Sequence, residues 1–469
     1  MQYFPDLQAV VNIVNKTKTM NRDVLIIICL SFPITKVQFF CSRVLCNFIL
    51  CHESNIKCQI TKKLYIFYSI HLRTDNLMQN MRMVRTFSLF TLFLFLVGCS
   101  SQLNEVSDYR VCAFVWPSCH DDSLGRTNWE KGIGEWEVIQ KGDARFPGHY
   151  QPKQPLWGYE MDNDPVVVEK WINTALAHGV NTFIYDWYWF AGGPYLESAL
   201  NDGFLKAPSN EKMEFFIMWA NHDVKHNYWN YHKWGEDDSM LWDGAIDPKD
   251  FPVIVKRVIE QYFKRANYSK INGCPVFAIY SVENFIKSFG SQEEALKAME
   301  YMRSEVVKAG FPGMHYMMMD GGGFSFKEKN IPRVEKRMFL KPDSWAWYNM
   351  GGFDPDYMVH GEKAIVRRNE WAEYMDIPVF PTVSIGWDDT PRFPAKGEND
   401  VTRFNHSPEA FKSLLIEAKK YADTHPEQPK YIMINAWNEW IEGSYLLPDR
   451  KWGYQWLEAV KDVFGPKEK

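Results

Sequence analysis

The chain has 469 residues and a formal net charge of −5 at pH 7. This length accommodates one barrel-sized domain with long insertions, and the acidic balance argues against a nucleic-acid-binding surface. Aromatic residues make up 16% of the chain, including 19 tryptophans, a content that fits carbohydrate contact as well as a large aromatic core.

Residues 81–99 have the pattern of an export signal. Arg82 and Arg85 precede an uncharged run at residues 87–97, which ends in Gly98 and Cys99. This is the order of a basic region, a hydrophobic region of secretory length and a small residue before a cleavage site. The ending resembles a bacterial lipobox, in which the cysteine is lipidated. We therefore expect a lipoprotein anchored through Cys99 to a bacterial membrane, on the periplasmic or cell-surface side of the outer membrane.

Residues 1–80 are expected to be a non-native upstream extension that does not fold. They carry five of the nine cysteines and show no sustained helical or strand period. The alternative is a membrane-associated extension around residues 24–32, a run too short to span a bilayer. We expect residues 100–108 to form a polar tether and residues 109–469 to form one domain.

In this domain, strand-like segments alternate with helical segments. Strands are predicted at residues 110–116, 181–187, 214–219, 275–280, 315–320, 342–348, 378–385 and 431–439. Helices are predicted at residues 164–179, 252–266, 291–310, 363–374, 407–421 and 453–464. This alternation predicts α/β architecture with a parallel sheet. About eight units favour a single (β/α)8 TIM barrel with long βα loops over a doubly wound sheet, because no glycine-rich dinucleotide turn follows the first strand.

The carboxyl ends of the strands in such a barrel converge on one face. Polar and aromatic residues at predicted strand ends are therefore candidate substrate-binding residues: Trp116, Asp186, Trp187, Asn221, His222, Tyr280, Trp387 and Asp388. His149, in the long first loop, is a further candidate, with a solvated loop histidine as the alternative. The acidic residues match no metal-binding loop, so we expect no metal ion.

The last predicted strand, residues 431–439, becomes more polar toward its end. Side chains alternate between the two faces of a strand, which places Asn435, Trp437 and Glu439 on one face. That gradient is typical of a strand whose far end lines a pocket. We expect Asn435 and Trp437 to contact a substrate there.

Glu442 follows Glu439 after three residues, which on a straight strand would face the opposite way. The chain must bend if both carboxylates serve one site, and Gly443 permits a bend. Two carboxylates flanked by tryptophans such as Trp440 suggest acid–base cleavage of a glycosidic bond. The alternative is that one glutamate lies on the surface and the tryptophans belong to the core.

Several motifs resemble glycoside hydrolase family 99. These are residues 381–392 (PTVSIGWDDTPR) and residues 435–443 (NAWNEWIEG). The closer likeness is to the family-99-like domains once labelled WbsX-type glycosyltransferases, related to the family 71/99 endo-alpha-mannosidase group. Those domains also show motifs like residues 148–152 (GHYQP) and 186–190 (DWYWF). The resemblance covers roughly residues 110–464.

This resemblance implies a (β/α)8 catalytic domain that cleaves α-glycosidic bonds with retention, without a metal ion or an organic cofactor. Carried over to this chain, Glu439 deprotonates the sugar's own 2-hydroxyl, which attacks the anomeric carbon and gives an anhydro-sugar intermediate. Glu442 protonates the leaving oxygen and later activates water. The motif also places Asn438 among the substrate-binding residues. Ile441 stands where family 99 usually has His, so mannose specificity is not carried over.

Two rival functions remain. One is a glycosyltransferase, which an exported lipoprotein without a nucleotide-binding signature disfavours. The other is a non-catalytic glycan-binding lipoprotein, in which both glutamates would be dispensable. The expected partners are a carbohydrate substrate in a complex polysaccharide or glycan, a lipid anchor and other glycan-degrading surface proteins, but no nucleic acid.

Overall fold

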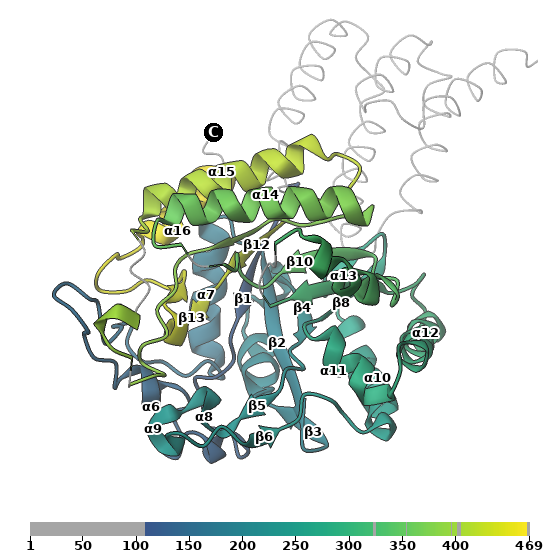
Figure 1. Cartoon of the computed structure of the whole chain (residues 1–469), viewed down its shortest axis with the longest axis horizontal. Helices are drawn as coiled ribbons and strands as arrows, with labels where there is room; N and C mark the ends of the chain where they lie inside the picture. The colour runs from purple at the N-terminus through teal and green to yellow at the C-terminus, as the bar shows by residue number, and fades with distance from the viewer. Residues whose placement is uncertain (1–107, 322–324, 353, 395, 401–404, 467–469) are drawn as a thin grey trace, which may run out of the picture. The chain divides into compact units, whose positions relative to one another are not determined.

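The computed structural model describes residues 108–466, apart from residues 322–324, 353, 395 and 401–404. The predicted signal with Cys99, the extension at residues 1–80 and nearly all of the tether lie outside the described residues. The described part is a barrel of parallel strands with helices around it (Figure 1).

Eight parallel strands form the barrel. They are β1 (Arg110–Val115), β2 (Thr182–Phe190), β4 (Glu214–Trp219), β8 (Cys274–Ile279), β9 (His315–Asp320), β10 (Ser344–Trp347), β11 (Thr382–Ser384) and β12 (Tyr431–Asn435). Their order in space is β10-β9-β8-β4-β2-β1-β12-β11. The two end strands meet where Trp345 bridges Val379, with the Trp345 amide donating to the Pro378 carbonyl at 2.9 Å. The sheet therefore closes, and the predicted (β/α)8 barrel is confirmed.

Helices follow the strands around the barrel. They are α7 (Pro165–Ala177), α10 (Phe251–Val258), α11 (Val282–Phe289), α12 (Gln292–Lys308), α13 (Ile331–Met338), α14 (Tyr357–Met375), α15 (Pro408–Thr424) and α16 (Gln455–Phe464). Asp164, Ser291 and Ser407, the first residues of three predicted helices, cap α7, α12 and α15 with their side chains. No helix in the described ranges is long and apolar enough to cross a membrane.

The loops that join the strands and helices carry short elements of their own, most of them in loops that follow a strand. These are α6 (Trp136–Ile139), β3 (Gly193–Tyr195), β5 (Val224–Lys225), α8 (His226–Trp229), α9 (Tyr231–Trp234), β6 (Met240–Trp242), β7 (Lys270–Ile271), β13 (Asn438–Glu439) and β14 (Ser444–Tyr445). In Figure 1, α6, α8, α9, β5 and β6 gather along the lower side. The predicted long βα loops are therefore present.

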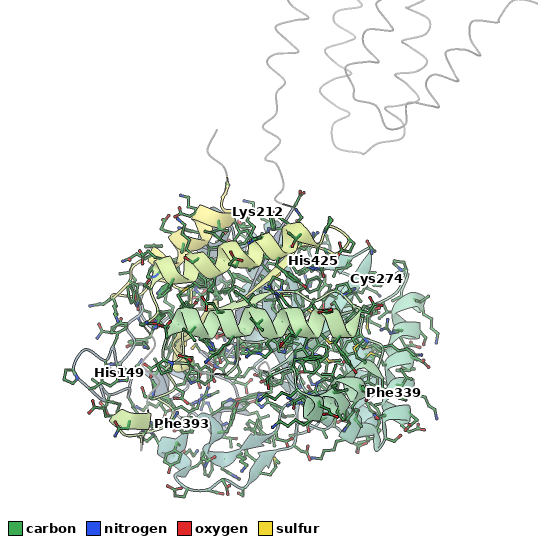
Figure 2. The ribbon with its side chains drawn as sticks, turned by 45° about the horizontal axis from the view of Figure 1, so that its top comes forward. His149, Lys212, Cys274, Phe339, Phe393 and His425 are labelled. Atoms are coloured by element: carbon green, nitrogen blue, oxygen red, sulfur yellow. The ribbon has the colours of Figure 1, made fainter. Side chains whose placement is uncertain are left out.

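Figure 2 labels residues from loops that lie before and after several of the strands. Lys212 and His425, which precede β4 and β12, lie toward the top, whereas His149 and Phe393, which follow β1 and β11, lie toward the lower left. The loops that follow the strands thus share one side of the molecule, where barrel enzymes carry their sites.

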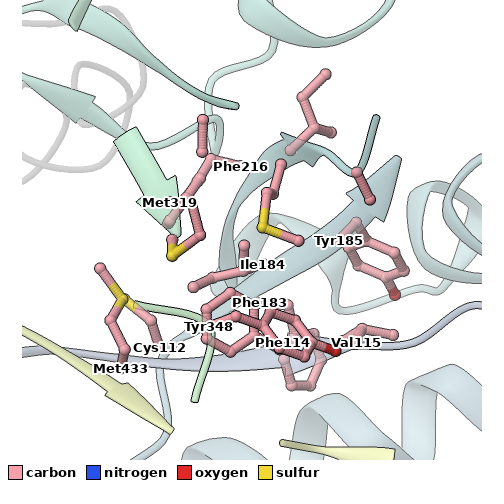
Figure 3. Packing of buried hydrophobic residues seen from close by; sticks show 14 of the residues in the cluster. Cys112, Phe114, Val115, Phe183, Ile184, Tyr185, Phe216, Met319, Tyr348 and Met433 are labelled. Atoms are coloured by element: carbon pink, nitrogen blue, oxygen red, sulfur yellow. The ribbon is translucent and has the colours of Figure 1, made fainter. Parts of the chain in front are cut away.

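Buried side chains from different strands pack together in the core (Figure 3). Phe114, Phe216, Met319 and Met433, from β1, β4, β9 and β12, are all fully buried. Each such side chain contributes roughly 1.5–3 kcal/mol through the apolar surface it removes from water. The Phe114 ring also lies 4.6 Å from the ring of Tyr348, so the core supports a side chain at the carboxyl end of β10.

Asp320, at the end of β9, belongs to a buried ion pair. Arg337 of α13 donates to it from Nε at 2.8 Å and from Nη2 at 3.0 Å. The guanidinium also contacts Glu283, at 2.7 and 2.9 Å. Only 1% of Arg337 and 3% of Asp320 are exposed, so this pair fastens α13 to the barrel.

Replacing Arg337 by Met is expected to lower the free energy of unfolding by about 3–5 kcal/mol, because it leaves the Asp320 carboxyl buried without its cation. Urea unfolding curves measure the loss. The matched control is Arg126→Met, which removes the exposed pair with Asp121 and should barely move the midpoint. Equal losses in both variants would show that burial of the Arg337 pair is not what stabilises the fold.

Candidate active site

The C-terminal stretch leaves the barrel earlier than predicted. β12 ends at Asn435, and a short hairpin of β13 and β14 follows, with a 3-10 turn at Trp440–Glu442 between them. Gly443 closes the turn with φ 65°, and a Cβ there would lie 2.9 Å from the Cβ of Asp388. Glycine is therefore required. The bend predicted at Gly443 is present, and both glutamates face one cavity.

That cavity has a volume of about 360 Å³ and lies at the carboxyl ends of the strands. Glu439 and Glu442 line it. The predicted substrate-binding residues that also line it are Trp116, Asp186, His222, Tyr280 and Trp387. Lining residues that the sequence reasoning missed include Tyr188, Tyr228, Trp229, Tyr348, Asn349 and Arg392. Aromatic walls with a few converging polar groups are typical of a site for a small, hydroxyl-rich ligand.

Glu439 and Asp186 share one tyrosine. The Tyr348 hydroxyl lies 2.8 Å from Oε2 of Glu439 and 3.1 Å from Oδ2 of Asp186. A hydroxyl has one proton to donate, so the second contact is a hydrogen bond only if that carboxyl carries a proton itself. Burial raises the pKa of both carboxyls well above their usual range, and the charges of Glu442 and Asp186 raise that of Glu439 further. The geometry and the electrostatics thus agree that this pair retains a proton.

Glu442 instead contacts a cation. Arg392 donates from Nη1 to Oε1 of Glu442 at 3.0 Å and from Nη2 to Oε1 of Glu135 at 3.3 Å. Burial raises the pKa of Glu442, and the Arg392 guanidinium opposes that rise. Glu135 is fully buried, and its other oxygen accepts hydrogen bonds from the Trp116 indole at 2.5 Å and the Ser118 hydroxyl at 3.0 Å. Arg392 therefore connects Glu442 to the wall of the cavity.

The imidazole of His222 is suited to accept a hydrogen bond. Its Nδ1 lies 3.0 Å from the Asp223 carbonyl, to which only a protonated nitrogen can donate. Burial lowers the pKa of His222. The ring is therefore neutral near pH 7, and its Nε2 is an acceptor.

Three predicted substrate-binding residues of the C-terminal motif, Asn435, Trp437 and Asn438, do not line the cavity. Asn438 clamps the backbone of Trp116, accepting from its amide at 2.9 Å and donating to its carbonyl at 2.7 Å. Trp437 is fully buried, with its ring 5.1 Å from that of Phe183. Because the strand ends at Asn435, alternation no longer decides where Trp437 points. Asn435 itself donates to Glu439 at 3.2 Å and so orients the carboxylate.

Trp187 and Asn221 also lie outside the cavity lining. The Trp187 indole donates to Glu197 at 2.8 Å, on the side of the strand away from the cavity. The Asn221 side chain donates to the Ser281 carbonyl and accepts from the Ser281 amide, both at 2.8 Å. It thereby ties the end of β4 to the end of β8, so both residues have structural roles in place of the predicted contact with substrate.

His149 and Asp388 contact each other and line a neighbouring cavity, not the one that contains Glu439. Oδ2 of Asp388 accepts from His149 Nε2 at 3.0 Å, Gln151 Nε2 at 2.7 Å and Lys153 Nζ at 2.9 Å. His149 Nδ1 accepts from the Arg145 amide at 3.0 Å, which makes the ring a neutral Nε2–H tautomer. Burial alone would raise the pKa of Asp388, but the charge of Lys153 holds that pKa well below its usual range.

The missed residues differ in how visible they were. Tyr348 closes a predicted strand, so the strand-end argument that selected Tyr280 also applies to it. Arg392 is the last residue of the quoted motif at residues 381–392. A positive charge within a motif that also contains carboxylates could have been selected from the sequence as a site residue. Glu135 lies in a long loop and had none. Within the described ranges, no group of three or more His, Cys, Asp or Glu residues could hold a metal ion.

Comparison with known proteins places the chain in a family. Residues 111–460 match the family model described as Glycosyltransferase WbsX. The chain belongs to this WbsX family. The protein WxcX of Xanthomonas campestris pv. campestris strain B100, described as uncharacterized, is 25% identical over 378 residues, which are 78% of this chain and 51% of the relative. WxcX of strain ATCC 33913 is 26% identical over 375 residues, 77% and 50% of the two chains. The chain thus spans about half the length of these curated relatives.

A solved structure supports the same grouping. The GH99 endo-alpha-mannosidase of Bacteroides thetaiotaomicron, in complex with BIS-TRIS-Propane, matches with a TM-score of 0.50 and 15% identity, over 76% of this chain and 97% of that one. Identity this low shows the fold alone. Together with the WbsX family match, it confirms the predicted resemblance to family-99-like WbsX-type domains.

Glu439→Gln is expected to flatten the pH dependence of stability. A carboxyl with a raised native pKa stabilises the fold while protonated, and that stability is lost as pH rises toward the native pKa. Between about pH 5 and pH 8, the free energy of unfolding should therefore fall less in the variant than in the parent, by about 1 kcal/mol or more. Urea unfolding at both pH values measures this. The control is Glu211→Gln at an exposed carboxyl, and a parent-like fall in the Glu439 variant would contradict the retained proton.

Proposed function

We propose that this WbsX-family chain is a glycoside hydrolase that cleaves α-glycosidic bonds in a complex polysaccharide or glycan with retention. The observation that carries the proposal is the placement of Glu439 and Glu442 in one aromatic-walled cavity. Two buried carboxyls so close cannot both ionise readily near neutral pH. One then serves as proton donor and the other as acceptor, which is what cleavage of a glycosidic bond needs.

In the proposed mechanism, Glu439 is the base that acts on the substrate's own 2-hydroxyl, and Glu442 is the general acid/base. Tyr348 and Asn435 hold Glu439 in place, and Arg392 holds Glu442. Before substrate binds, the retained proton lies on the side of Glu439 and Asp186, away from the guanidinium. The proposed roles therefore require a proton shift to Glu442 when the sugar enters.

Asp186 is proposed to bind a sugar hydroxyl beside this pair. Its Oδ1 is buried without a hydrogen-bond partner among the described residues. A buried acceptor without a partner is unfavourable by about 1–3 kcal/mol, which a hydroxyl donor would offset. His222, Trp116, Tyr280 and Trp387 would complete the contacts around the ring.

A glycosyltransferase is the second candidate, because the family description names that activity. Both activities make or break a glycosidic bond, and they differ in whether water or another sugar accepts the glycosyl group. Transfer from a nucleotide sugar, with no hydrolysis of any glycan, would favour a glycosyltransferase.

Saturable glycan binding that is equal in the parent and in both glutamate variants, with no product, would favour a binding protein.

Glu442→Gln is expected to lower turnover of natural α-linked glycans by about a hundredfold or more, the scale of losing a general acid. With an activated aryl glycoside the first release of aryl alcohol should be slowed much less, because that leaving group departs without a proton, whereas the later step in which Glu442 activates water stays slow. Glu439→Gln should lose activity on both kinds of substrate. New reducing ends and released aryl alcohol report the rates.

The leaving-group comparison also tests the roles. Rescue by the aryl glycoside in the Glu439 variant, and not in the Glu442 variant, would reverse the proposed assignment. Unchanged turnover in a folded Glu442→Gln protein would remove Glu442 from the mechanism. Glu211→Gln, at an exposed carboxyl, is the control for the substitution itself.

We further propose that the protein is an exported lipoprotein anchored through Cys99, a proposal that rests on the sequence of residues 81–99. Cys99→Ser should abolish incorporation of labelled palmitate in a bacterial host and shift the protein from the membrane to the soluble fraction. Cys274→Ser is the control and should keep both. Palmitate labelling that survives in the Cys99 variant would exclude this anchor.

A further inference from the structure

A second cavity adjoins the one that contains Glu439 and Glu442. It has a volume of about 150 Å³, and Trp387 lines both cavities. Gly443, the residue directly after Glu442, lines it too. The Asp388 amide donates to the Glu442 carbonyl at 2.6 Å. A glycan whose scissile bond lies at Glu442 can therefore extend past Trp387 into this second cavity.

The walls of the second cavity combine aromatic rings with lysines. The rings are those of Phe146, Tyr150, Trp387, Tyr445, Trp452 and Trp456. Lys153 and Lys451 supply the ammonium groups. Nζ of Lys451 lies 5.6 Å from the centre of the Tyr150 ring and 4.8 Å from that of Trp452. Flat apolar faces beside ammonium donors suit a sugar ring that carries a negative charge.

The two lysines differ in their partners. Lys153 pairs with Asp388, whose carboxylate also accepts from His149 and Gln151. Lys451 has no ion pair with any residue that the structure describes. The carboxylate of Asp449 is engaged elsewhere, accepting from the Tyr445 hydroxyl at 2.7 Å and the Trp452 amide at 2.6 Å.

One ammonium group at this cavity is therefore left for a ligand. Burial and the neighbouring charge of Lys153 lower the pKa of Lys451, and Asp449 offsets this only in part. An anion between the two lysines would relieve their repulsion. A single unpaired cation matches a monoanion better than a dianionic phosphate.

We propose that the second cavity is a subsite for a hexuronic acid residue of the glycan, with its carboxylate held by Lys451 and Lys153 and its ring against Trp452. This proposal rests on the proposed function and deepens it, because it makes the substrate an acidic polysaccharide. The subsite selects among glycans and leaves the chemistry at Glu439 and Glu442 unchanged.

Isothermal titration of the inactive Glu442→Gln protein tests the subsite without cleavage. The probes are α-linked oligosaccharides that contain a hexuronic acid, each paired with its carboxyl-reduced neutral counterpart. We expect the acidic member to bind at least about tenfold more tightly at low salt, as expected for a charge-assisted contact. Adding Lys451→Gln should remove this preference, so that both members bind with similar affinity. Lys451→Arg should keep most of it, and Lys420→Gln, at an exposed lysine on α15, should keep all of it.

Several results would overturn the proposal. These are equal binding of both members by the Glu442→Gln protein, a preference that survives Lys451→Gln, and a stronger preference for a sulfate ester of the neutral oligosaccharide than for the uronic acid. The two proposals also fail separately. Cleavage of neutral glycans without any acidic preference would leave the hydrolase standing and remove the subsite. A Lys451-dependent preference for the acidic oligosaccharide, with no cleavage by the parent, would support the subsite and remove the hydrolase.

Discussion

The acidic mouth of this barrel depends on one buried guanidinium. Four carboxyls, of Glu135, Asp186, Glu439 and Glu442, lie at or beside the cavity, and within the described residues only Arg392 forms ion pairs with them. One positive charge cannot balance four negative charges in a desolvated site. The cluster therefore keeps protons at neutral pH, and they are held on the side away from Arg392. The same imbalance is expected to weaken the fold as pH rises, and in the proposed mechanism it supplies the proton for acid catalysis.

Asp388 holds two loops of the barrel together. It draws His149, Gln151 and Lys153 from the first long loop onto the segment that follows β11. That segment carries Trp387 on one side and Arg392 on the other. Residues that resemble ligand-binding groups in the sequence thus serve to hold the wall between the two cavities. Asp388 fixes the positions of Trp387 and Arg392. Its carboxylate oxygen already accepts hydrogen bonds from His149, Gln151 and Lys153.

The family description names a glycosyltransferase, whereas the proposed activity is hydrolysis, and that proposal rests on the site. A barrel fold hosts many chemistries, so it does not by itself fix the function. The hairpin that turns Glu439 and Glu442 into one cavity, with an acceptor at Asp186 and aromatic walls, is the arrangement on which the proposed cleavage of a glycosidic bond rests. In the proposal, the second cavity selects among glycans without adding a reacting group, because its polar side chains contact the part of the glycan that extends beyond Trp387.

The sequence by itself determined the barrel, the caps of its helices, the bend at Gly443 and the pairing of Glu439 with Glu442. All of these follow from patterns within a few residues, such as alternation, capping and glycine conformation. Only the tertiary structure decided that Trp437 and Asn438 turn into the protein and that Glu135 meets Arg392. These last two residues are 257 positions apart, and no local pattern encodes such a contact. It exists because the closed sheet brings the first and the seventh strand–loop units to one mouth, where a buried charge must find its partner.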